Sequence, residues 1–181
     1  MGVITHNWAT PCGELILGSW GEELCLCDWQ HRGMRSTIDA RIQRGLGATF
    51  EKGFSRTIEM AQEQLTRYFE GTLTEFSVPI RFIGTPFQCA VWEALLHIPY
   101  GHTSTYTELT ARVSRPEAIR AVASANGANA LSILVPCHRV IGSTGELVGY
   151  AGGLRAKRHL LQLEAEKART TFDLFSNQHS T

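Results

Sequence analysis

Residues 133–140 constrain the chain most, because they place a proline, a thiol, an imidazole and a guanidinium among aliphatic side chains. The stretch reads Ile-Leu-Val-Pro-Cys-His-Arg-Val. Burying such polar groups is costly unless they are paired or used in chemistry. The aliphatic run predicts the end of a buried strand, and Pro136 cannot donate a hydrogen bond to a sheet. Cys137 is therefore predicted to lie where the chain leaves that strand, a position from which it can react.

Cys137 is the candidate nucleophile. A buried thiol alone is more often an inert small hydrophobe, but the adjacent imidazole and guanidinium favour a thiolate. A helix predicted to begin at Leu154 places Glu164 on one face with Leu154 and Leu161, where a carboxylate requires a partner. His138 is the candidate partner. The result is the thiol, imidazole and acid of a Cys-His-acid relay, in which His138 reaches the thiol through a turn or a bridging water.

Three capping signals predict helices in the middle of the chain. Residues 85–88 read Thr-Pro-Phe-Gln, residues 105–108 read Thr-Tyr-Thr-Glu, and residues 114–117 read Ser-Arg-Pro-Glu. Each sets an N-cap hydroxyl three positions ahead of a Gln or Glu side chain. The last two predict short helices joined by a tight turn, which is the pattern of a helix-turn-helix.

The second of these two helices has mostly small side chains on its surface. Ala121, Ser124 and Gly127 would let a DNA groove approach closely, and Arg120 projects beside them. Packing against a neighbouring helix explains the small residues equally well on sequence alone. Charge favours DNA. The chain has a formal net charge of zero, but residues 101–160 hold seven Lys and Arg against three Asp and Glu, while residues 1–80 hold seven against ten.

Three uses of the relay can be compared. A cysteine hydrolase leaves the helix-turn-helix unexplained, and a DNA-binding regulator leaves the relay unexplained. An enzyme that acts on a DNA base needs both, because the base must leave the stack to be reached. The glycine-rich residues 142–153 are either a wall of the slot beside Cys137 or a surface turn without function.

Length and cysteine content limit the number of domains and the cellular compartment that can be expected. The chain has 181 residues, enough for one or two compact domains. Its five cysteines lack a disulfide framework, which predicts a reducing compartment. Cys25 and Cys27 have no second pair at metal-ligand spacing, so no zinc site is expected. No stretch is apolar enough to span a membrane and no signal pattern begins the chain, so a soluble intracellular protein is expected.

The elements ahead of a boundary near Gly84 are less distinct. They are predicted to be a strand hairpin, a stretch that is mostly loop, a helix ended by Gly71, and a strand with a bulge or edge at Pro79. The hairpin covers residues 13–20 and 24–29, and the loop covers residues 31–54. The helix covers residues 58–69, and the last strand covers residues 76–83.

Residues 136–140, Pro-Cys-His-Arg-Val, resemble the active-site motif of the O6-alkylguanine-DNA alkyltransferases, also called methylated-DNA-protein-cysteine methyltransferases. The likeness runs from about Thr85 to Glu164, with a weaker one ahead of it. It implies an α/β protein with a strand-rich, ribonuclease-H-like N-terminal domain of structural role over residues 1–83. A helical C-terminal domain over residues 84–168 would carry a winged-helix-like helix-turn-helix that enters the minor groove, followed by a tail over residues 169–181.

The resemblance also implies the activity. Cys137 would take a methyl or other alkyl group from O6 of guanine, and less readily from O4 of thymine, in double-stranded DNA, without cofactor or metal. A thioether on Cys137 has no good leaving group, so each molecule would react once. The protein is expected to be monomeric and to work in the cytoplasm, or in the nucleus if it is eukaryotic. The alternatives are a sensor of alkylated DNA that does not repair it and, third, a cysteine hydrolase.

The family's roles transfer to individual residues of this sequence. His138 would be the base acting through water, Glu164 would orient it, and Tyr106 would help rotate the nucleotide out and donate a proton toward the leaving base. Arg120 would fill the space left in the duplex. The remaining assignments are a hinge at Asn129, a lysine near the cysteine at Lys157, and a pocket lined by Val140, Val148, Tyr150 and Ala151.

The end of the chain has a separate resemblance. Residues 171–175, Thr-Phe-Asp-Leu-Phe, loosely resemble peptides that bind bacterial sliding clamps, although they lack the leading glutamine of those peptides. Docking of the two phenylalanines on the protein itself, or disorder of the tail, are the alternatives.

Overall fold

A four-stranded sheet forms the N-terminal part of the computed structural model, which describes residues 1–176 and, for residues 170–176, the backbone alone. Its strands are β1 (Val3–Thr10), β2 (Gly13–Trp20), β3 (Glu23–Trp29) and β4 (Phe50–Lys52), in the spatial order β3-β2-β1-β4. The first three run antiparallel, and β4 lies parallel to β1. The predicted hairpin is confirmed. Polar residues such as His6 and Asn7 obscure the pattern of β1, which was not predicted.

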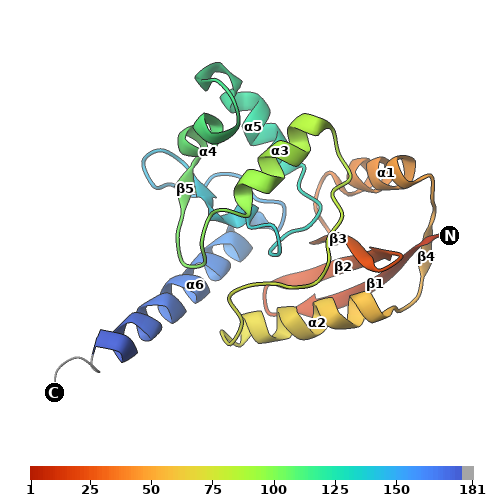
Figure 1. The fold of residues 1–181 in the computed structure, drawn as a ribbon, viewed down its shortest axis with the longest axis horizontal. Coiled ribbons are helices and arrows are strands. Elements are labelled where there is room, and N and C mark those ends of the chain that lie inside the picture. Colours follow the sequence, from red (N-terminus) through yellow and green to blue (C-terminus); the bar gives the residue numbers. More distant parts are fainter. Residues whose placement is uncertain (177–181) are drawn as a thin grey trace.

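Two helices cover the sheet, one on each face (Figure 1). On one face, α2 (Arg56–Phe69) packs Ile58 and Leu65 against Leu15 and Leu17 of β2. Ser55 caps this helix by accepting a hydrogen bond from the Ile58 N–H, and Gly71, with a φ of 70°, follows its end as predicted.

On the other face lies α1 (Arg35–Leu46), where the sequence predicted mostly loop. That prediction is wrong for residues 35–46 and for β4. Only Ile38 and Ile42 of α1 are buried, and no side chain caps its N-terminus. The helix therefore depends on packing against the sheet rather than on a signal of its own sequence.

The predicted strand over residues 76–83 is also wrong. The backbone of the segment pairs with the sheet through a single bridge, between Leu24 and Ile80. The Leu24 N–H donates to the Pro79 carbonyl at 2.8 Å, and the Arg81 N–H donates to the Leu24 carbonyl at 2.9 Å. Pro79 has no N–H to extend the pairing, so the ladder stops there.

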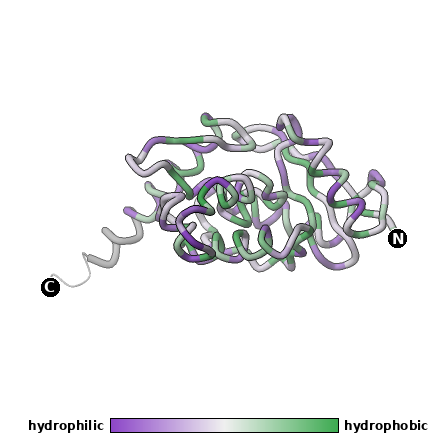
Figure 2. Tube along the Cα trace, turned by 90° about the horizontal axis from the view of Figure 1, so that it is seen from above, coloured by the Kyte–Doolittle hydropathy of each residue, from purple (hydrophilic) through white to green (hydrophobic). Residues whose placement is uncertain are grey.

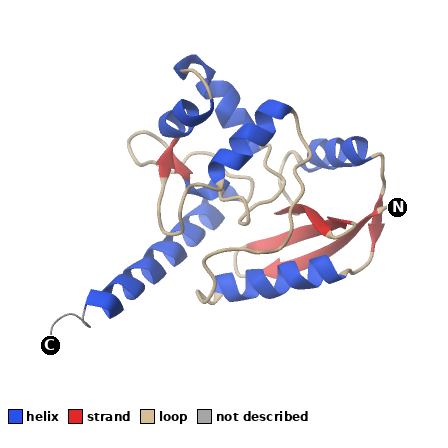
Figure 3. Ribbon diagram, in the orientation of Figure 1, coloured by secondary structure: helices blue, strands red, loops and turns tan. Residues whose placement is uncertain are grey.

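The C-terminal part is helical, with a short parallel pair of strands (Figure 3). In chain order it contains α3 (Pro86–Leu95), β5 (Ser104–Thr105), α4 (Tyr106–Val113), η1 (Pro116–Ala118), α5 (Ile119–Gly127), η2 (Cys137–Arg139), β6 (Val140–Ile141) and α6 (Gly153–Ser176). Helices α3, α4 and α5 pack on one another. The mixed α/β class is confirmed, whereas the division near residue 84 stays a prediction.

Two of the three predicted capping boxes form. Thr85 and Thr105 each accept from the backbone three residues on, and the Gln88 and Glu108 side chains accept from the capping residues' N–H groups. The box predicted at Ser114 does not form, because Ser114 ends α4 by donating its N–H to the Thr110 carbonyl. The next turn begins one residue later than that box requires, with Pro116 in its first position.

Hydrophobic and hydrophilic stretches are interspersed along the whole chain trace (Figure 2). Among the described residues, no helix combines the length and apolarity needed to cross a membrane. The backbone of residues 171–175, which carry the clamp-like sequence, is helical within α6, but their side chains lie outside the described part, so the clamp prediction is untested.

Candidate functional site

The segment that carries Cys137 is an irregular buried loop and not the end of a regular strand, so that prediction is wrong. Its backbone pairs with the sheet through one bridge, from Leu131 to Cys27. Ile133 has a φ of 74°, a left-handed conformation that turns the chain out of strand geometry. The Asn129 side chain replaces the missing ladder: its Nδ2 donates to the Val135 carbonyl at 2.9 Å, and its Oδ1 accepts from the Leu131 N–H at 2.9 Å.

Cys137 begins the 3₁₀ turn that follows Pro136, and its side chain borders a cavity of about 310 Å³. Only 4% of the residue is exposed. Its sulfur accepts a hydrogen bond from Asn129 Nδ2 at 3.2 Å. Burial raises the pKa of the Cys137 thiol to about 11, against the hydrogen bond from Asn129, which lowers it. The resting group is therefore a thiol, and it needs a base to become a nucleophile.

His138 and Glu164 form the pair that the sequence predicted. His138 Nε2 lies 2.7 Å from Glu164 Oε1, and both residues are fully buried. Burial lowers the pKa of His138, which favours the neutral imidazole, although Glu164 opposes this shift. An ionised carboxylate only accepts, so Nε2 carries the proton in the neutral ring and Nδ1 holds the free lone pair. Among the described residues Nδ1 has no hydrogen-bond partner.

Glu164 accepts further hydrogen bonds that hold it ionised. Arg139 donates from Nε at 2.9 Å and from Nη2 at 3.0 Å, the Tyr68 hydroxyl donates at 2.6 Å, and the Gly101 N–H donates at 3.2 Å. Burial alone would raise the pKa of Glu164, but the bonds from His138 and Arg139 outweigh it and lower the pKa to about 2. Glu164 is thus a fixed anion at neutral pH.

Lys157 is fully buried on the inner face of α6. Its Nζ donates to the carbonyls of Val140 at 2.6 Å, Val148 at 2.8 Å and Gly149 at 3.4 Å. Burial lowers its pKa. The lysine therefore ties the glycine-rich loop to β6. The predicted inner face of α6 was partly wrong, because Leu154 is 44% exposed.

The cavity gathers some of the predicted residues and leaves others outside. The predicted residues that line it are Tyr106, Gly127, Asn129, Cys137, Tyr150 and Ala151. Val140, which is fully buried, and Val148, which is 45% exposed, do not line it. The Tyr106 hydroxyl accepts a hydrogen bond from Asn126 Nδ2 at 3.5 Å. Burial raises the pKa of Tyr106.

The outer face of α5 is exposed at Arg120, Ala121, Ser124 and Gly127. The helix packs inward through Val122 and Ala125, whose carbonyl accepts from Trp92 Nε1 at 2.8 Å. The small outer residues therefore do not serve helix packing within the described chain.

Several residues that contribute to the site were not predicted from the sequence. Arg32, Gly33 and Met34, in the turn after β3, line the cavity. Tyr68, which binds Glu164, lies in the helix predicted over residues 58–69, but no role in the site was predicted for it. No local pattern marks these residues, because their partners lie far away in the sequence.

Comparisons with known proteins agree with this geometry. A family model described as "6-O-methylguanine DNA methyltransferase, DNA binding domain" matches residues 86–166. A methylated-DNA–protein-cysteine methyltransferase of Haemophilus influenzae is 41% identical over 158 residues, which cover 87% of this chain and 83% of that protein. The chain belongs to the methylated-DNA–protein-cysteine methyltransferase family. The family predicted from residues 136–140 is therefore confirmed.

Other methyltransferases extend the likeness. One from Mycobacterium tuberculosis strain H37Rv is 52% identical over 115 residues, or 64% of this chain and 70% of that protein. The crystal structure of the M. tuberculosis protein OGT in complex with DNA has a TM-score of 0.77 at 40% identity, covering 91% of this chain and 94% of that one. The methyltransferase fold thus extends through the N-terminal sheet, beyond the residues that the family model matches.

Proposed function

We propose that this methyltransferase repairs double-stranded DNA by moving an alkyl group from O6-alkylguanine, or from O4-alkylthymine, onto its own Cys137. The observation that carries the proposal is the placement of the Cys137 sulfur at a cavity, directly next in sequence to an imidazole held by a buried carboxylate. The family membership supports the same reaction. No cofactor or metal enters the chemistry.

The proposed chemistry is a direct displacement. A water relays the thiol proton to His138 Nδ1, the nitrogen whose lone pair is free, while Glu164 holds the ring through Nε2. The sulfur attacks the alkyl carbon, the bond from that carbon to O6 breaks, and the electron pair stays with the base. Tyr106, at the cavity, donates a proton toward the leaving base. The Asn129 side chain orients the Cys137 sulfur through its hydrogen bond.

The base reaches the cavity by leaving the duplex. The exposed face of α5 is proposed to enter the minor groove, where Ala121, Ser124 and Gly127 allow close approach and Arg120 fills the vacated space. Tyr150 and Ala151 then form a wall beside the base. In this proposal residues 84–168 are the winged-helix-like DNA-binding and acceptor domain, and residues 1–83 are a ribonuclease-H-like support.

Each molecule is expected to react once, because the thioether carbon on Cys137 has no good leaving group. The experiment is intact-mass measurement of the protein after incubation with a duplex that contains one O6-methylguanine, followed by peptide mapping. A gain of one methyl group on the Cys137 peptide, saturating at one per protein, is expected. Binding of the duplex with unchanged protein mass and intact lesion would overturn the proposal in favour of a sensor of alkylated DNA.

A further inference from the structure

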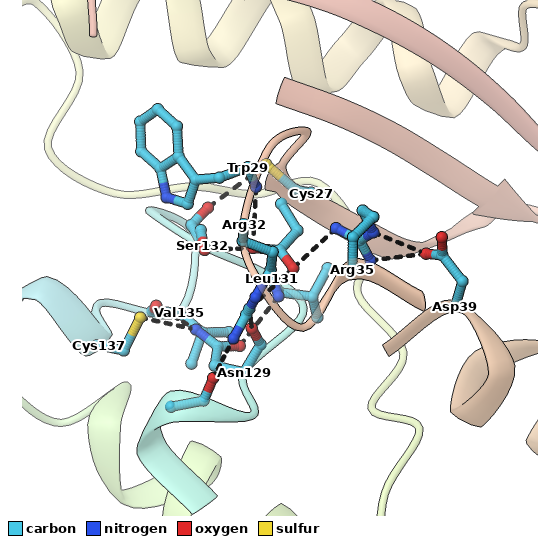
Figure 4. Close-up of polar contacts among 12 residues, drawn as sticks. Cys27, Trp29, Arg32, Arg35, Asp39, Asn129, Leu131, Ser132, Val135 and Cys137 are labelled. Carbon is cyan, nitrogen blue, oxygen red and sulfur yellow. Dashed lines mark hydrogen bonds and ion pairs between the residues drawn. The ribbon is translucent and has the colours of Figure 1, made fainter. Parts of the chain in front are cut away.

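Arg32, in the turn between β3 and α1, reaches across to the segment that carries Cys137 (Figure 4). Only 5% of its side chain is exposed. Its Nη1 donates to the Asn129 carbonyl at 3.1 Å, and its Nη2 donates to the Gly127 carbonyl. A planar guanidinium suits this task, because its donors are fixed in one fork.

The two carbonyls that Arg32 binds have distinct roles. Gly127 is the last residue of α5, where a cation compensates the helix dipole and satisfies a carbonyl without an intrahelical partner. Asn129 holds the Cys137 sulfur through its side-chain amide. One guanidinium therefore fixes both the end of α5 and the residue that aims the sulfur.

A buried carboxylate holds Arg32 in turn. Asp28 Oδ2 accepts from Arg32 Nη1 at 2.9 Å and from Arg35 Nη1 at 2.9 Å, while Oδ1 accepts from the Ser132 hydroxyl at 3.1 Å. Asp28 thus anchors the same loop at a second point. Arg35 shares the carboxylate, but its other ion pair is with Asp39 of α1, which lies on the opposite side of Arg35 from Cys137 (Figure 4).

We propose that Arg32 is a positioning residue for alkyl transfer, which holds the end of α5 and the Asn129 amide in register with the Cys137 sulfur. This inference rests on the proposed function. It assigns a reaction role to the N-terminal part, which the family model's match, beginning at residue 86, does not include. The charge of Arg32 also lowers the pKa of Cys137, against the larger effect of burial.

The test compares Arg32→Leu and Arg32→Lys with the matched control Arg35→Leu. Arg35→Leu removes a partner of the same Asp28 oxygen but no bond to residues 127–129. Mass spectrometry gives the fraction of molecules that can be methylated, and rapid quenching gives the single-turnover rate constant on the O6-methylguanine duplex. Alkylation of the Cys137 peptide by iodoacetamide across pH gives the midpoint of thiol ionisation.

Arg32→Leu is expected to slow transfer per active molecule by about 100-fold, because a small misplacement of reacting groups has effects of that order. Arg32→Lys should recover part of the rate, since the charge remains while the fork is lost. The alkylation midpoint should shift to higher pH in Arg32→Leu. Arg35→Leu should stay within about twofold of the wild type in both measurements, because it leaves the geometry at Asn129 and Cys137 intact.

Three outcomes separate the possibilities. If Arg32→Leu and Arg32→Lys lower only the active fraction, with rate constant and midpoint unchanged, Arg32 supports the fold alone and the inference is wrong. Equal slowing in Arg35→Leu would also overturn it. A wild-type protein that transfers no methyl group would instead refute the proposed function, while the iodoacetamide profile would still report the coupling of Arg32 to Cys137.

Discussion

The Tyr68 hydroxyl of α2 donates a 2.6 Å hydrogen bond to Glu164 Oε1 of α6, across 96 residues of sequence. The acid of the candidate relay is therefore held partly by the N-terminal part of the chain. Glu164 Oε1 receives this bond together with those from His138 and Arg139. The carboxylate that orients the imidazole depends on both parts of the molecule.

Tyr68→Phe should lower the free energy of unfolding by about 2 kcal/mol, because it removes a buried hydrogen bond to a charged group and leaves the ring packing intact. Urea unfolding measures the change. Phe69→Leu, which alters the half-buried ring that packs against Tyr68 but forms no hydrogen bond to Glu164, is the control. An unchanged urea midpoint in Tyr68→Phe would show that Arg139 and His138 satisfy the carboxylate alone.

Cys137→Ala should abolish alkyl transfer and leave affinity for the alkylated duplex within about twofold, because the side chain is buried and lies behind the surface proposed to face DNA. Intact mass and a gel-shift titration measure the two properties. Cys89→Ala, which removes a half-buried thiol on α3, should transfer normally. Methylation of Cys137→Ala at another residue would move the acceptor elsewhere.

Stability should fall in acid through Glu164. The folded pKa of about 2 lies below the ordinary 4.5, so its stabilisation is complete above the ordinary pKa and is lost as pH falls from 4.5 toward 2. The gap corresponds to about 3 kcal/mol. Urea unfolding between pH 6 and pH 3 should show about 2 kcal/mol of this loss in the wild type and a smaller pH dependence in Glu164→Gln. Parallel profiles would contradict the assignment.

The transfer rate should stay constant as the pH falls from neutral to mildly acidic, and should decrease only at more acidic pH. Burial lowers the folded pKa of His138 below 6.5, so the neutral imidazole needed as base persists to more acidic pH than in a free histidine. Single-turnover rates per active molecule should begin to fall only below pH 6.5. A fall that starts above pH 7.5 would assign the base to another group.

Lys157→Met should destabilise the protein by about 1 to 3 kcal/mol and slow transfer, because buried carbonyls of β6 and the glycine-rich loop lose their donor. Arg158→Met, on the exposed side of α6, is the matched control. Thermal unfolding and single-turnover rates report the two effects. Normal stability in Lys157→Met would mean that the loop does not need this tether.

Arg120→Ala should slow reaction with the duplex at least 10-fold more than reaction with the free O6-methylguanine base, because the proposed role of Arg120 is to fill the space left in the stack. Arg44→Ala, an exposed arginine of α1, removes the same charge away from α5 and should leave both rates close to those of the wild type. Equal losses on both substrates would exclude an intercalating role.

Local signals explain which parts of the fold could be predicted. The capping boxes at Thr85 and Thr105 involve residues three positions apart, so the sequence alone specifies them. The pairing of His138 with Glu164 was predictable because a carboxylate on the apolar face of a helix requires a partner. The reading of residues 133–135 as strand failed because the Asn129 side chain, and not a neighbouring strand, satisfies the loop backbone.

Contacts between distant residues explain what could not be predicted. Helix α1 has only Ile38 and Ile42 to indicate a buried face, and it forms because the sheet covers that face. Arg32 binds the Asn129 carbonyl 97 residues away, and nothing near Arg32 in the sequence indicates that partner. The pair of His138 and Glu164 was visible in the sequence, but the other side chains that hold Glu164 and the Cys137 loop in place were not.

The long sequence separations within the site also set the order in which it can be assembled during synthesis. The bond from Ser132 to Asp28 spans 104 residues, and contacts so far apart form late because long loops must close first. Cys137 and His138 leave the ribosome before Glu164 does. A nascent chain therefore carries its thiol and imidazole without the anion that orients the imidazole, and the pair of His138 and Glu164 forms only when α6 docks.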